Sequence, residues 1–128
     1  MVLFSPGKGK EFFLEQLGFL GTGDIDRILD EHYHPDAVMV TFDGVRRGRE
    51  QLKEYYVNTL RAMGQVKGMS VQYFIETEDV IMFKATVEDE RGTIHADNGF
   101  YMRDGKIYRH IALTLPPGVD PLPEPKSG

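Results

Sequence analysis

The sequence predicts an α+β domain, in which an antiparallel sheet of about six strands packs on three helices. Two observations support this prediction. Apolar residues recur with helical spacing in three segments before Gly64, and after it they form runs rich in β-branched and aromatic side chains. Helices first and a meander of strands afterwards is the order of an α+β fold. The length of 128 residues is that of a single domain.

The first two helices are separated by a short glycine-containing segment. One helix is expected over about residues 10–20, where Phe13 and Leu17 lie one turn apart on the same face. A second helix begins after Asp24, whose side chain is a good N-cap. It ends before Pro35, because the residue that precedes a proline is pushed out of helical geometry. The inward stripe of this helix is formed by Ile25, Ile28, Leu29, His32 and Tyr33.

A third helix is expected over residues 48–63, after a short hairpin. Its apolar stripe has the most regular helical periodicity in the chain. The stripe is formed by Leu52, Tyr55, Tyr56, Thr59, Leu60 and Met63. The hairpin before this helix turns at Asp43-Gly44, a pair that two-residue hairpin loops favour.

The strands alternate with short connections, and the last four form a meander. The expected strands are residues 37–42, 45–47, 66–77, 80–88, 93–102 and 106–115. The last connection, Arg103-Asp104-Gly105, fits a three-residue loop with a type I turn and a left-handed glycine.

Both ends of the chain are expected to lie outside the domain, which spans residues 10–115. Residues 1–9 contain Pro6 and Gly7 and are predicted to be a flexible lead-in. Residues 116–128 hold five of the seven prolines, a composition that pairs and packs poorly. We therefore expect a mobile tail there.

The composition excludes several classes of function. The chain has no cysteine, which removes disulfide scaffolds, thiol nucleophiles and thiolate zinc sites. Its net charge of −5 and its scattered basic residues argue against nucleic acid as a partner, because such binding depends on neutralising phosphates. No apolar run has the length of a membrane span, and the N-terminus lacks the apolar core of a signal peptide. We expect a soluble, cytoplasmic protein that contacts no membrane.

No motif for a cofactor stands out. The sequence contains no phosphate-binding loop, Rossmann fingerprint or nucleophile elbow. His32 and His34 have the spacing of two metal ligands on a strand, but the segment straddles the end of a helix. We predict neither a cofactor nor a metal site.

Three motifs resemble those of a known family. Residues 23–38 read GDIDRILDEHYHPDAV, similar to the GDLD…YHPDAV signature of SnoaL-like domains. Residues 45–50, VRRGRE, followed by two tyrosines, resemble the entry into the third helix of these domains. Residues 103–110 resemble their closing RDGKI…H hairpin. The resemblance spans about residues 10–115 and implies the nuclear transport factor two-like fold.

That fold implies a cone-shaped, curved antiparallel sheet with a pocket between its concave face and the helices. The family includes ketosteroid isomerases, polyketide cyclases, limonene-epoxide hydrolases and non-catalytic binding or scaffold proteins. The fold by itself does not choose among these activities.

The isomerase-like members need a carboxylate base at the end of the first strand, where this chain has Thr41. Threonine is far too weak a base to remove a carbon-bound proton. The oxyanion-hole positions of these enzymes match Gln16 and Asn98, which can donate hydrogen bonds to a carbonyl oxygen. The resemblance therefore keeps the polar donors and lacks the base.

The carboxylates of two other enzyme types are missing as well. The cyclase-like members use an aspartate on the last strand, where this chain has Ala112. The epoxide hydrolase-like members use an Asp–Arg–Asp relay, and the matching residues are Ala112, Lys84 and Thr86. None of the three family chemistries is therefore retained intact.

Alternation along the strands predicts which side chains face the pocket. If Asn98 faces inward, Phe100 does so too, and His110 follows across the last turn. On the neighbouring strand Met82 and Lys84 are expected inward. The predicted ligand-binding residues are Gln16, His32, Tyr33, Thr41, Tyr55, Asn98 and Phe100. An apolar cup with a few polar groups suits a small, largely apolar molecule with a carbonyl, hydroxyl or carboxylate.

His110 and Lys84 are the candidate catalytic residues. An imidazole can transfer protons near neutral pH, whereas the alternative for His110 is a hydrogen-bonded core histidine. An inward Lys84 needs a partner, such as a ligand carboxylate, or becomes a neutral base on desolvation. The alternatives are an ion pair with Glu88 or Asp97, or a strand that faces the other way.

The opposite face of the sheet is expected to be apolar and to need a partner. Its members on two of the strands are Ile81, Phe83, Ala85, Val87, Ile107, Ile111, Leu113 and Leu115. Similar family members dimerise through their sheets, so we expect a homodimer.

Two main functions, and a weaker third one, remain open on the sequence. The first is an isomerase-, cyclase-, hydrolase- or dehydratase-type enzyme, with His110 transferring a proton while Asn98, Gln16 or Tyr33 orients a carbonyl. The second is a non-catalytic protein that only binds a ligand in the same pocket. A scaffold role that uses the fold for association is a third possibility.

Overall fold

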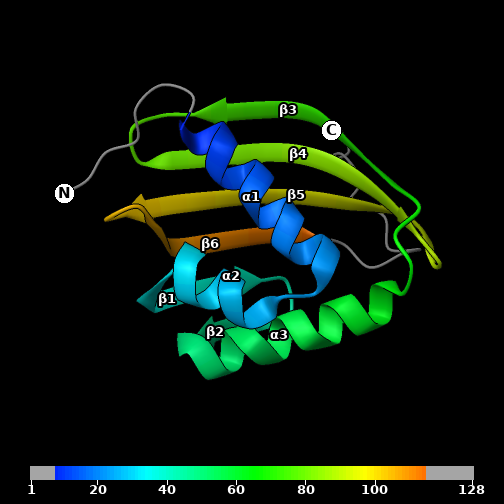
Figure 1. Ribbon diagram of the computed structural model, residues 1–128, viewed down its shortest axis with the longest axis horizontal. Coiled ribbons are helices and arrows are strands. Elements are labelled where there is room, and N and C mark those ends of the chain that lie inside the picture. The colour runs from blue at the N-terminus through cyan, green and yellow to red at the C-terminus, as the bar shows by residue number, and fades with distance from the viewer. Residues whose placement is uncertain (1–7, 115–128) are drawn as a thin grey trace, which may run out of the picture.

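The computed structural model describes residues 8–114, in which three helices lie on one face of a curved six-stranded sheet (Figure 1). The helices are α1 (Lys8–Thr22), α2 (Ile25–His32) and α3 (Gly48–Met63). The strands are β1 (Tyr33–Thr41), β2 (Gly44–Arg47), β3 (Gly68–Glu76), β4 (Val80–Asp89), β5 (Gly92–Arg103) and β6 (Lys106–Thr114). The predicted α+β class is confirmed. The predicted tail at 116–128 and most of the lead-in at 1–9 lie outside the described residues.

The sheet has the strand order β2-β1-β6-β5-β4-β3, and it is not wholly antiparallel as expected. The first and last strands, β1 and β6, pair in parallel, with Met39 opposite His110. A parallel pair needs a long crossover, and here the crossover contains β2, α3 and three strands. This pairing places the start of β1 beside β6 and so brings together residues that are far apart in sequence.

The turn between β5 and β6 is one residue shorter than predicted. Arg103 pairs with Lys106, so only Asp104 and Gly105 form the loop. Both have positive φ, 54° and 77°, as the two central residues of a type I′ turn require. The twist of such a turn matches that of the flanking strands, which explains why the two-residue loop is favoured.

The start of α2 follows a local signal in the sequence, whereas its end does not. The side chain of Asp24 accepts a hydrogen bond from the backbone N–H of Arg27 and caps α2, as predicted. The helix ends at His32, earlier than expected, and Tyr33 begins β1 instead of continuing the helical stripe. Arg49 at the start of α3 forms ion pairs with Asp26 and Asp30, and so ties α3 to α2.

The core lies between the helices and the inner face of the sheet. From α1, the ring of Phe13 packs on Phe74 and Phe83, with ring centroids 5.4 and 4.4 Å apart. Burial of one such side chain stabilises the fold by roughly 1.5–3 kcal/mol. Fully buried residues from every layer join this core, among them Ile28, Met39, Leu52, Ile81, Phe100 and Ile107.

The predicted face of β4 is wrong. Ile81 and Ala85 are buried, whereas Met82 and Lys84 are exposed. The reason is the register, because Phe83 pairs with Asn98 and directly paired residues share a face. Ile107 is also buried, since the register of β5 and β6 shifts between Ile107 and Arg109. These residues therefore belong to the inner face and not to the outer one.

The outer face of the sheet carries a row of exposed apolar side chains from four strands, with Gly99 of β5 between them. Cross-strand pairing joins Ile75 to Met82, Met82 to Gly99, Gly99 to Ile111, and Ile111 to Val40. The four side chains of this row are 44–55% exposed. We call Ile75, Met82, Ile111 and Val40 the outer row. No helix within residues 8–114 covers it, because all three lie on the other face (Figure 1).

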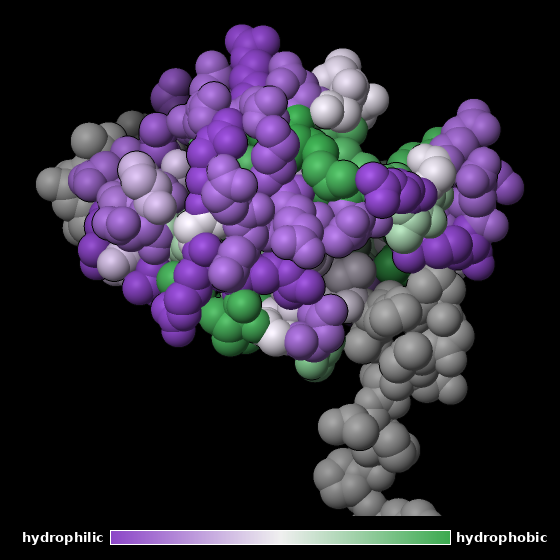
Figure 2. All heavy atoms as spheres, turned by 90° about the horizontal axis from the view of Figure 1, so that it is seen from below, coloured by the Kyte–Doolittle hydropathy of each residue, from purple (hydrophilic) through white to green (hydrophobic). Residues whose placement is uncertain are grey.

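Hydrophilic side chains dominate the lower side of the molecule, where apolar ones appear only in separate small areas (Figure 2). Within the described part of the chain, no helix is long and apolar enough to cross a membrane.

Candidate functional site

An apolar pocket of about 290 Å³ lies between the inner face of the sheet and the helices α1 and α3. Its walls are apolar over most of their area, with Leu17 and Leu20 from α1, Leu60 and Met63 from α3, and Phe83 from β4. Pockets for small molecules in proteins start near this size and have the same kind of lining. The pocket therefore suits a small apolar molecule.

Five of the predicted site residues do line this pocket. They are Gln16, Tyr55, Asn98, Phe100 and His110. The resemblance to SnoaL-like domains indicated Gln16 and Asn98, and strand alternation from Asn98 then indicated Phe100.

The side chain of Gln16 is the least satisfied polar group of the pocket. It is only 3% exposed, and its Nε2 has no hydrogen-bond partner. A buried amide left without a partner costs about 1–3 kcal/mol. Native structures leave few such groups, so an unpaired amide on a pocket wall indicates a place where a ligand atom can bind.

Four polar side chains form a continuous hydrogen-bonded chain along the other wall. Nε2 of His110 lies 2.7 Å from Oδ1 of Asn98. The other ring nitrogen, Nδ1, lies 2.7 Å from the hydroxyl of Tyr33. That hydroxyl in turn lies 2.6 Å from the hydroxyl of Tyr56.

The direction of every bond in this chain follows from one backbone carbonyl. The amide nitrogen of Asn98 donates to the carbonyl of Ala96, so its oxygen must face His110. Nε2–H of His110 then donates to that oxygen, which leaves Nδ1 as an acceptor.

The hydroxyl of Tyr33 consequently donates to Nδ1 of His110, and the hydroxyl of Tyr56 donates to Tyr33. The imidazole thus has its single lone pair engaged and its single N–H engaged. A histidine in this arrangement has no free nitrogen with which to accept a proton from a ligand.

Burial keeps all members of the chain uncharged. Burial lowers the pKa of His110 to about 3, so the ring is neutral at physiological pH. Burial likewise raises the pKa of Tyr33 and of Tyr56 well above that of an exposed tyrosine. The hydrogen-bonded side chains of this wall are therefore neutral over the whole physiological pH range.

Lys84 does not face the pocket. It lies on the outer face of β4, half exposed, and its ammonium donates to the carboxylate of Asp97 across 3.2 Å. This is one of the alternatives left open by the sequence. The expectation of an inward-facing lysine is wrong because the register of β4 against β5 places the odd-numbered residues inward.

Two other predicted ligand-binding residues lie outside the pocket. The hydroxyl of Thr41 donates within the β1–β2 hairpin, to Asp43 and to the carbonyl of Gly44. Tyr33 lies behind the wall, where it joins Tyr56 to His110 and lines a smaller cavity of about 230 Å³. At that cavity Arg49 forms an ion pair with Asp30, and the ammonium of Lys106 donates to the backbone carbonyl of Asp30.

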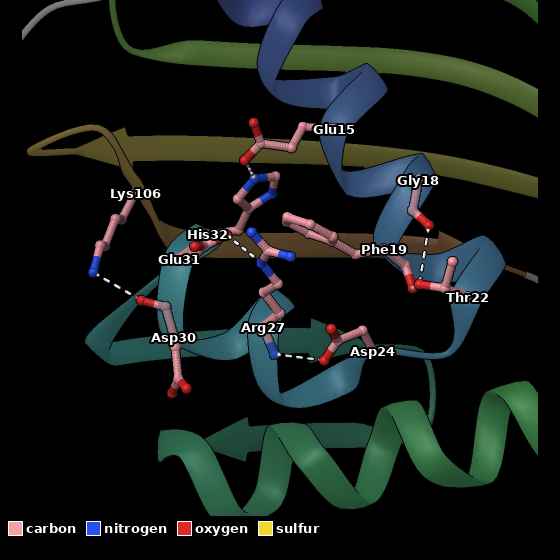
Figure 3. A network of polar contacts seen from close by, with 10 residues as sticks. All are labelled: Glu15, Gly18, Phe19, Thr22, Asp24, Arg27, Asp30, Glu31, His32 and Lys106. Atoms are coloured by element: carbon pink, nitrogen blue, oxygen red, sulfur yellow. Dashed lines mark hydrogen bonds and ion pairs between the residues drawn. The ribbon is translucent and has the colours of Figure 1, made fainter.

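His32 is buried between α1 and α2 and does not line the pocket. Its Nε2 lies 2.9 Å from the carboxylate of Glu15, a contact drawn as a dashed line in Figure 3. The ring of Phe12 stacks on the imidazole. Burial lowers the pKa of His32, although the hydrogen bond that its ring donates to the carboxylate of Glu15 opposes this shift. The contact fixes α2 against α1, and we assign His32 to packing between the helices.

The only charged residue that lines the pocket among residues 8–114 is Arg91, in the turn between β4 and β5. Its guanidinium donates to the carboxylate of Asp89, whose side chain is fully buried. Asp89 therefore neutralises the charge of Arg91 before any ligand binds.

Sequence reasoning missed several apolar residues of the pocket. Phe83 and Val87 line it from β4, and Met69 lines it from β3. A usable signal was present, because Ile81, Phe83 and Val87 form a more apolar alternation than Met82, Lys84 and Thr86 do.

Comparison with known proteins agrees with this architecture. The model of the SnoaL-like domain family matches residues 13–110. Among curated proteins, no sequence matches the chain.

Many solved structures share the fold, and three of them are instructive. TerC, co-crystallised with polyporic acid, is 26% identical, with 82% of this chain and 89% of that chain covered and a TM-score of 0.60. SalBIII, described as an epoxide hydrolase/cyclase-like enzyme of salinomycin pyran ring formation, is 19% identical, with 86% and 92% covered and a TM-score of 0.67. A protein of unknown function from Cytophaga hutchinsonii, described as NTF2-like, is 18% identical, with 84% and 90% covered and a TM-score of 0.63.

Proposed function

Because this chain belongs to the SnoaL-like domain family, we propose that it binds a small, largely apolar molecule in the pocket between its sheet and its helices. The observation that carries this proposal is the unpartnered amide of Gln16 on the wall of an apolar pocket of about 290 Å³. An apolar cavity with one convergent polar group is the usual form of a small-molecule site. The co-crystal of TerC with polyporic acid supports the idea that this architecture accepts small organic molecules.

The geometry favours binding over proton transfer. Both nitrogens of His110 are engaged by Asn98 and Tyr33. Among the described residues that line the pocket there is no aspartate or glutamate. A general base must have a free lone pair within hydrogen-bond reach of the proton that it removes. Neither the histidine nor any carboxylate of residues 8–114 meets this condition at the pocket wall.

Native mass spectrometry of the purified protein tests the binding proposal. We expect one small organic molecule per protomer, either co-purified or taken up from a set of apolar fragments. The variant Ala96→Phe is the matched control, because Ala96 lines the pocket and a phenyl ring there fills it. The proposal fails if no fragment perturbs the NMR signals of Phe83 and Phe100, or if Ala96→Phe binds as well as the wild type.

A second candidate function is an enzyme of the cyclase or hydrolase kind. The observation that favours it is the hydrogen-bonded chain from Asn98 through His110 and Tyr33 to Tyr56, which could orient a reacting carbonyl. The description of SalBIII as an epoxide hydrolase/cyclase-like enzyme is consistent with such chemistry. If any bound fragment is turned over, His110→Gln should reduce the rate at least tenfold and Lys84→Ala should leave it unchanged. Equal rates for the wild type and the two variants would exclude this role of His110.

We also propose that the protein is a homodimer, joined through the outer row of Ile75, Met82, Ile111 and Val40. The support is a continuous apolar stripe on a sheet face that no described helix covers. Contiguous exposed apolar surface is typical of association sites. The ion pair of Lys84 with Asp97 lies beside this stripe and suits the polar rim of an interface.

A further inference from the structure

A second cavity lies where the end of α2 and the start of β1 meet the starts of α3 and β6. Its volume is about 230 Å³, and none of its lining residues lines the larger apolar pocket. Sites for drug-sized molecules begin near about 300 Å³, so this cavity suits a smaller organic molecule. Its apolar lining residues include Leu29, Pro35 and Leu52, and its polar ones are Asp30, His34, Arg49 and Lys106.

Lys106 is a lining cation that no carboxylate of residues 8–114 neutralises. Arg49 forms ion pairs with Asp26 and Asp30. The ammonium of Lys106 donates instead to the backbone carbonyl of Asp30, 3.0 Å away (Figure 3). An ammonium has several N–H donors and no acceptor, so this one bond leaves Lys106 with further donors and with its full charge.

His34 adds a neutral donor to the lining of the same cavity. Its Nδ1 accepts a hydrogen bond from the backbone N–H of Asp36 at 3.1 Å, so Nε2 carries the ring proton. Within the described part of the chain, that Nε2 makes no hydrogen bond. The ring lies against Tyr108, with ring centroids 5.2 Å apart, and this contact holds its plane.

The positive charge continues beyond the cavity along β6. The guanidiniums of Arg103 and Arg109 lie 3.7 and 3.9 Å from the ring centroid of Tyr108. Arg109 donates only to backbone carbonyls, and neither guanidinium forms an ion pair within residues 8–114. In a chain of net charge −5, such a group of unneutralised cations attracts anions over roughly 10 Å.

We propose that this cavity binds a small organic carboxylate, whose apolar part lies against Leu29 and Leu52. The carboxylate accepts hydrogen bonds from Lys106 and from Nε2 of His34. Its single negative charge balances the lining, because Arg49 is already neutralised. The site is separate from the pocket of the proposed function and does not depend on it.

A phosphate dianion matches this lining less well than a carboxylate does. It would bring a second negative charge, beside the carboxylate of Asp30 that already lines the cavity. Arg103 and Arg109 do not line the cavity, and both are exposed, so water and salt screen their charges.

NMR titration with three probes tests the proposal at pH 7, in a cationic buffer free of carboxylate and phosphate. Benzoate carries one negative charge, benzamide is its neutral analogue, and phenyl phosphate carries nearly two. We expect benzoate to bind about fivefold or more tightly than benzamide, the effect of a partly exposed charge-assisted hydrogen bond, and more tightly than phenyl phosphate. Benzoate should shift the ring signals of His34 and Tyr108 and bind more weakly as salt is added.

The variant Lys106→Gln should bind benzoate and benzamide equally. The control Lys10→Gln removes the same charge from an exposed position of α1, whose first turn contacts Glu76 of β3 at the far edge of the sheet, and should keep the preference. Circular dichroism checks that both variants are folded.

Four results would overturn the inference. They are equal binding of benzoate and benzamide to the wild type, tighter binding of phenyl phosphate, a preference that survives in Lys106→Gln, and no binding of any probe at His34 and Tyr108. Because the two cavities share no lining residue, signals of Phe83 and Phe100 report on the larger pocket separately. Failure here therefore leaves the proposed function standing.

Discussion

The hydroxyl of Tyr33 donates a hydrogen bond to Nδ1 of His110 across 2.7 Å, and so joins the first residue of β1 to the middle of β6. The two residues are 77 positions apart, and the parallel pairing of β1 with β6 brings them together. Both side chains are buried. This bond fixes the tautomer of His110 and, through Tyr56, connects the sheet to α3. Removal of this bond should change the free energy of unfolding and the dependence of that free energy on pH.

Tyr33→Phe should destabilise the protein by roughly 2–4 kcal/mol. The change leaves Nδ1 of His110 without a donor and the hydroxyl of Tyr56 without an acceptor, and each buried orphan costs about 1–3 kcal/mol. Urea denaturation measures the loss. Tyr73→Phe is the control, because Tyr73 is 67% exposed and its change should alter the free energy of unfolding by less than about 0.5 kcal/mol. Equal effects of the two substitutions would show that the buried chain contributes little.

The stability of the protein should fall as the pH is lowered from about 6.5 toward 3. The pKa of His110 is about 3 in the fold and near 6.5 in the unfolded chain, so the unfolded state binds the proton first. Stability rises with pH wherever the unfolded state binds more protons, and it is lost as pH falls through this window. Each such histidine contributes a slope of at most about 1.4 kcal/mol per pH unit.

Thermal melts between pH 7 and pH 4 test this dependence. The pKa of His32 is also lowered by burial, so His32 adds to the slope. His110→Gln should reduce the slope, whereas His95→Gln, at an exposed position, should leave it as in the wild type. A wild-type stability that is constant from pH 7 to pH 4 would contradict the neutral, buried state of His110.

The three helices were predictable because they depend on local signals, although α2 ends at His32, before the position that Pro35 indicated. The cap at Asp24 and the third helix over residues 48–63 need no long-range contact to be recognised. The two-residue turn formed by Asp104 and Gly105 was wrongly predicted as a three-residue loop. Both kinds of hairpin loop favour a glycine as their last residue, so Gly105 does not distinguish them.

The face of β4 was mispredicted because alternation alone does not say which set of residues points inward. The choice depends on the register with β5, and a slip by one residue exchanges the faces of a whole strand. The pairing of Phe83 with Asn98 fixes this register and places Lys84 on the outer face, away from the pocket. The greater apolarity of the odd-numbered residues was the physical signal for the correct face.

The hydrogen-bonded chain of the site likewise could not be predicted from the sequence. Asn98 and His110 were predicted to share a face, and the antiparallel pairing of β5 with β6 brings them close. Tyr33 and Tyr56 join them only through the parallel contact of β1 with β6 and through the position of α3. Neither contact produces a periodic pattern in the sequence from which it could be predicted.

Gln16→Met should raise the free energy of unfolding by about 1 kcal/mol. Replacement of a buried, unpaired amide by an apolar side chain of similar length removes its desolvation penalty and keeps its packing. A functional residue often has this signature, since binding sites keep groups that the fold alone would not. Chemical denaturation without ligand measures the change. If Gln16→Met is destabilising by 1 kcal/mol or more, then the amide has a structural role and its availability to a ligand is refuted.

Ile111→Glu should convert the proposed dimer into a folded monomer. Ile111 is 52% exposed and lies within the outer row, where pairing connects it to Gly99 and Val40. A carboxylate placed there would be buried without a partner at the interface, a cost that far exceeds the effect of lost apolar area. Sedimentation velocity distinguishes the two states, and circular dichroism confirms that the monomer is folded. Phe42→Glu is the control, because Phe42 is 67% exposed in the β1–β2 hairpin, outside the row, and its substitution should leave the dimer intact. A wild-type protein that sediments as a monomer at micromolar concentration would refute the dimer, and dissociation by both variants would place the interface elsewhere.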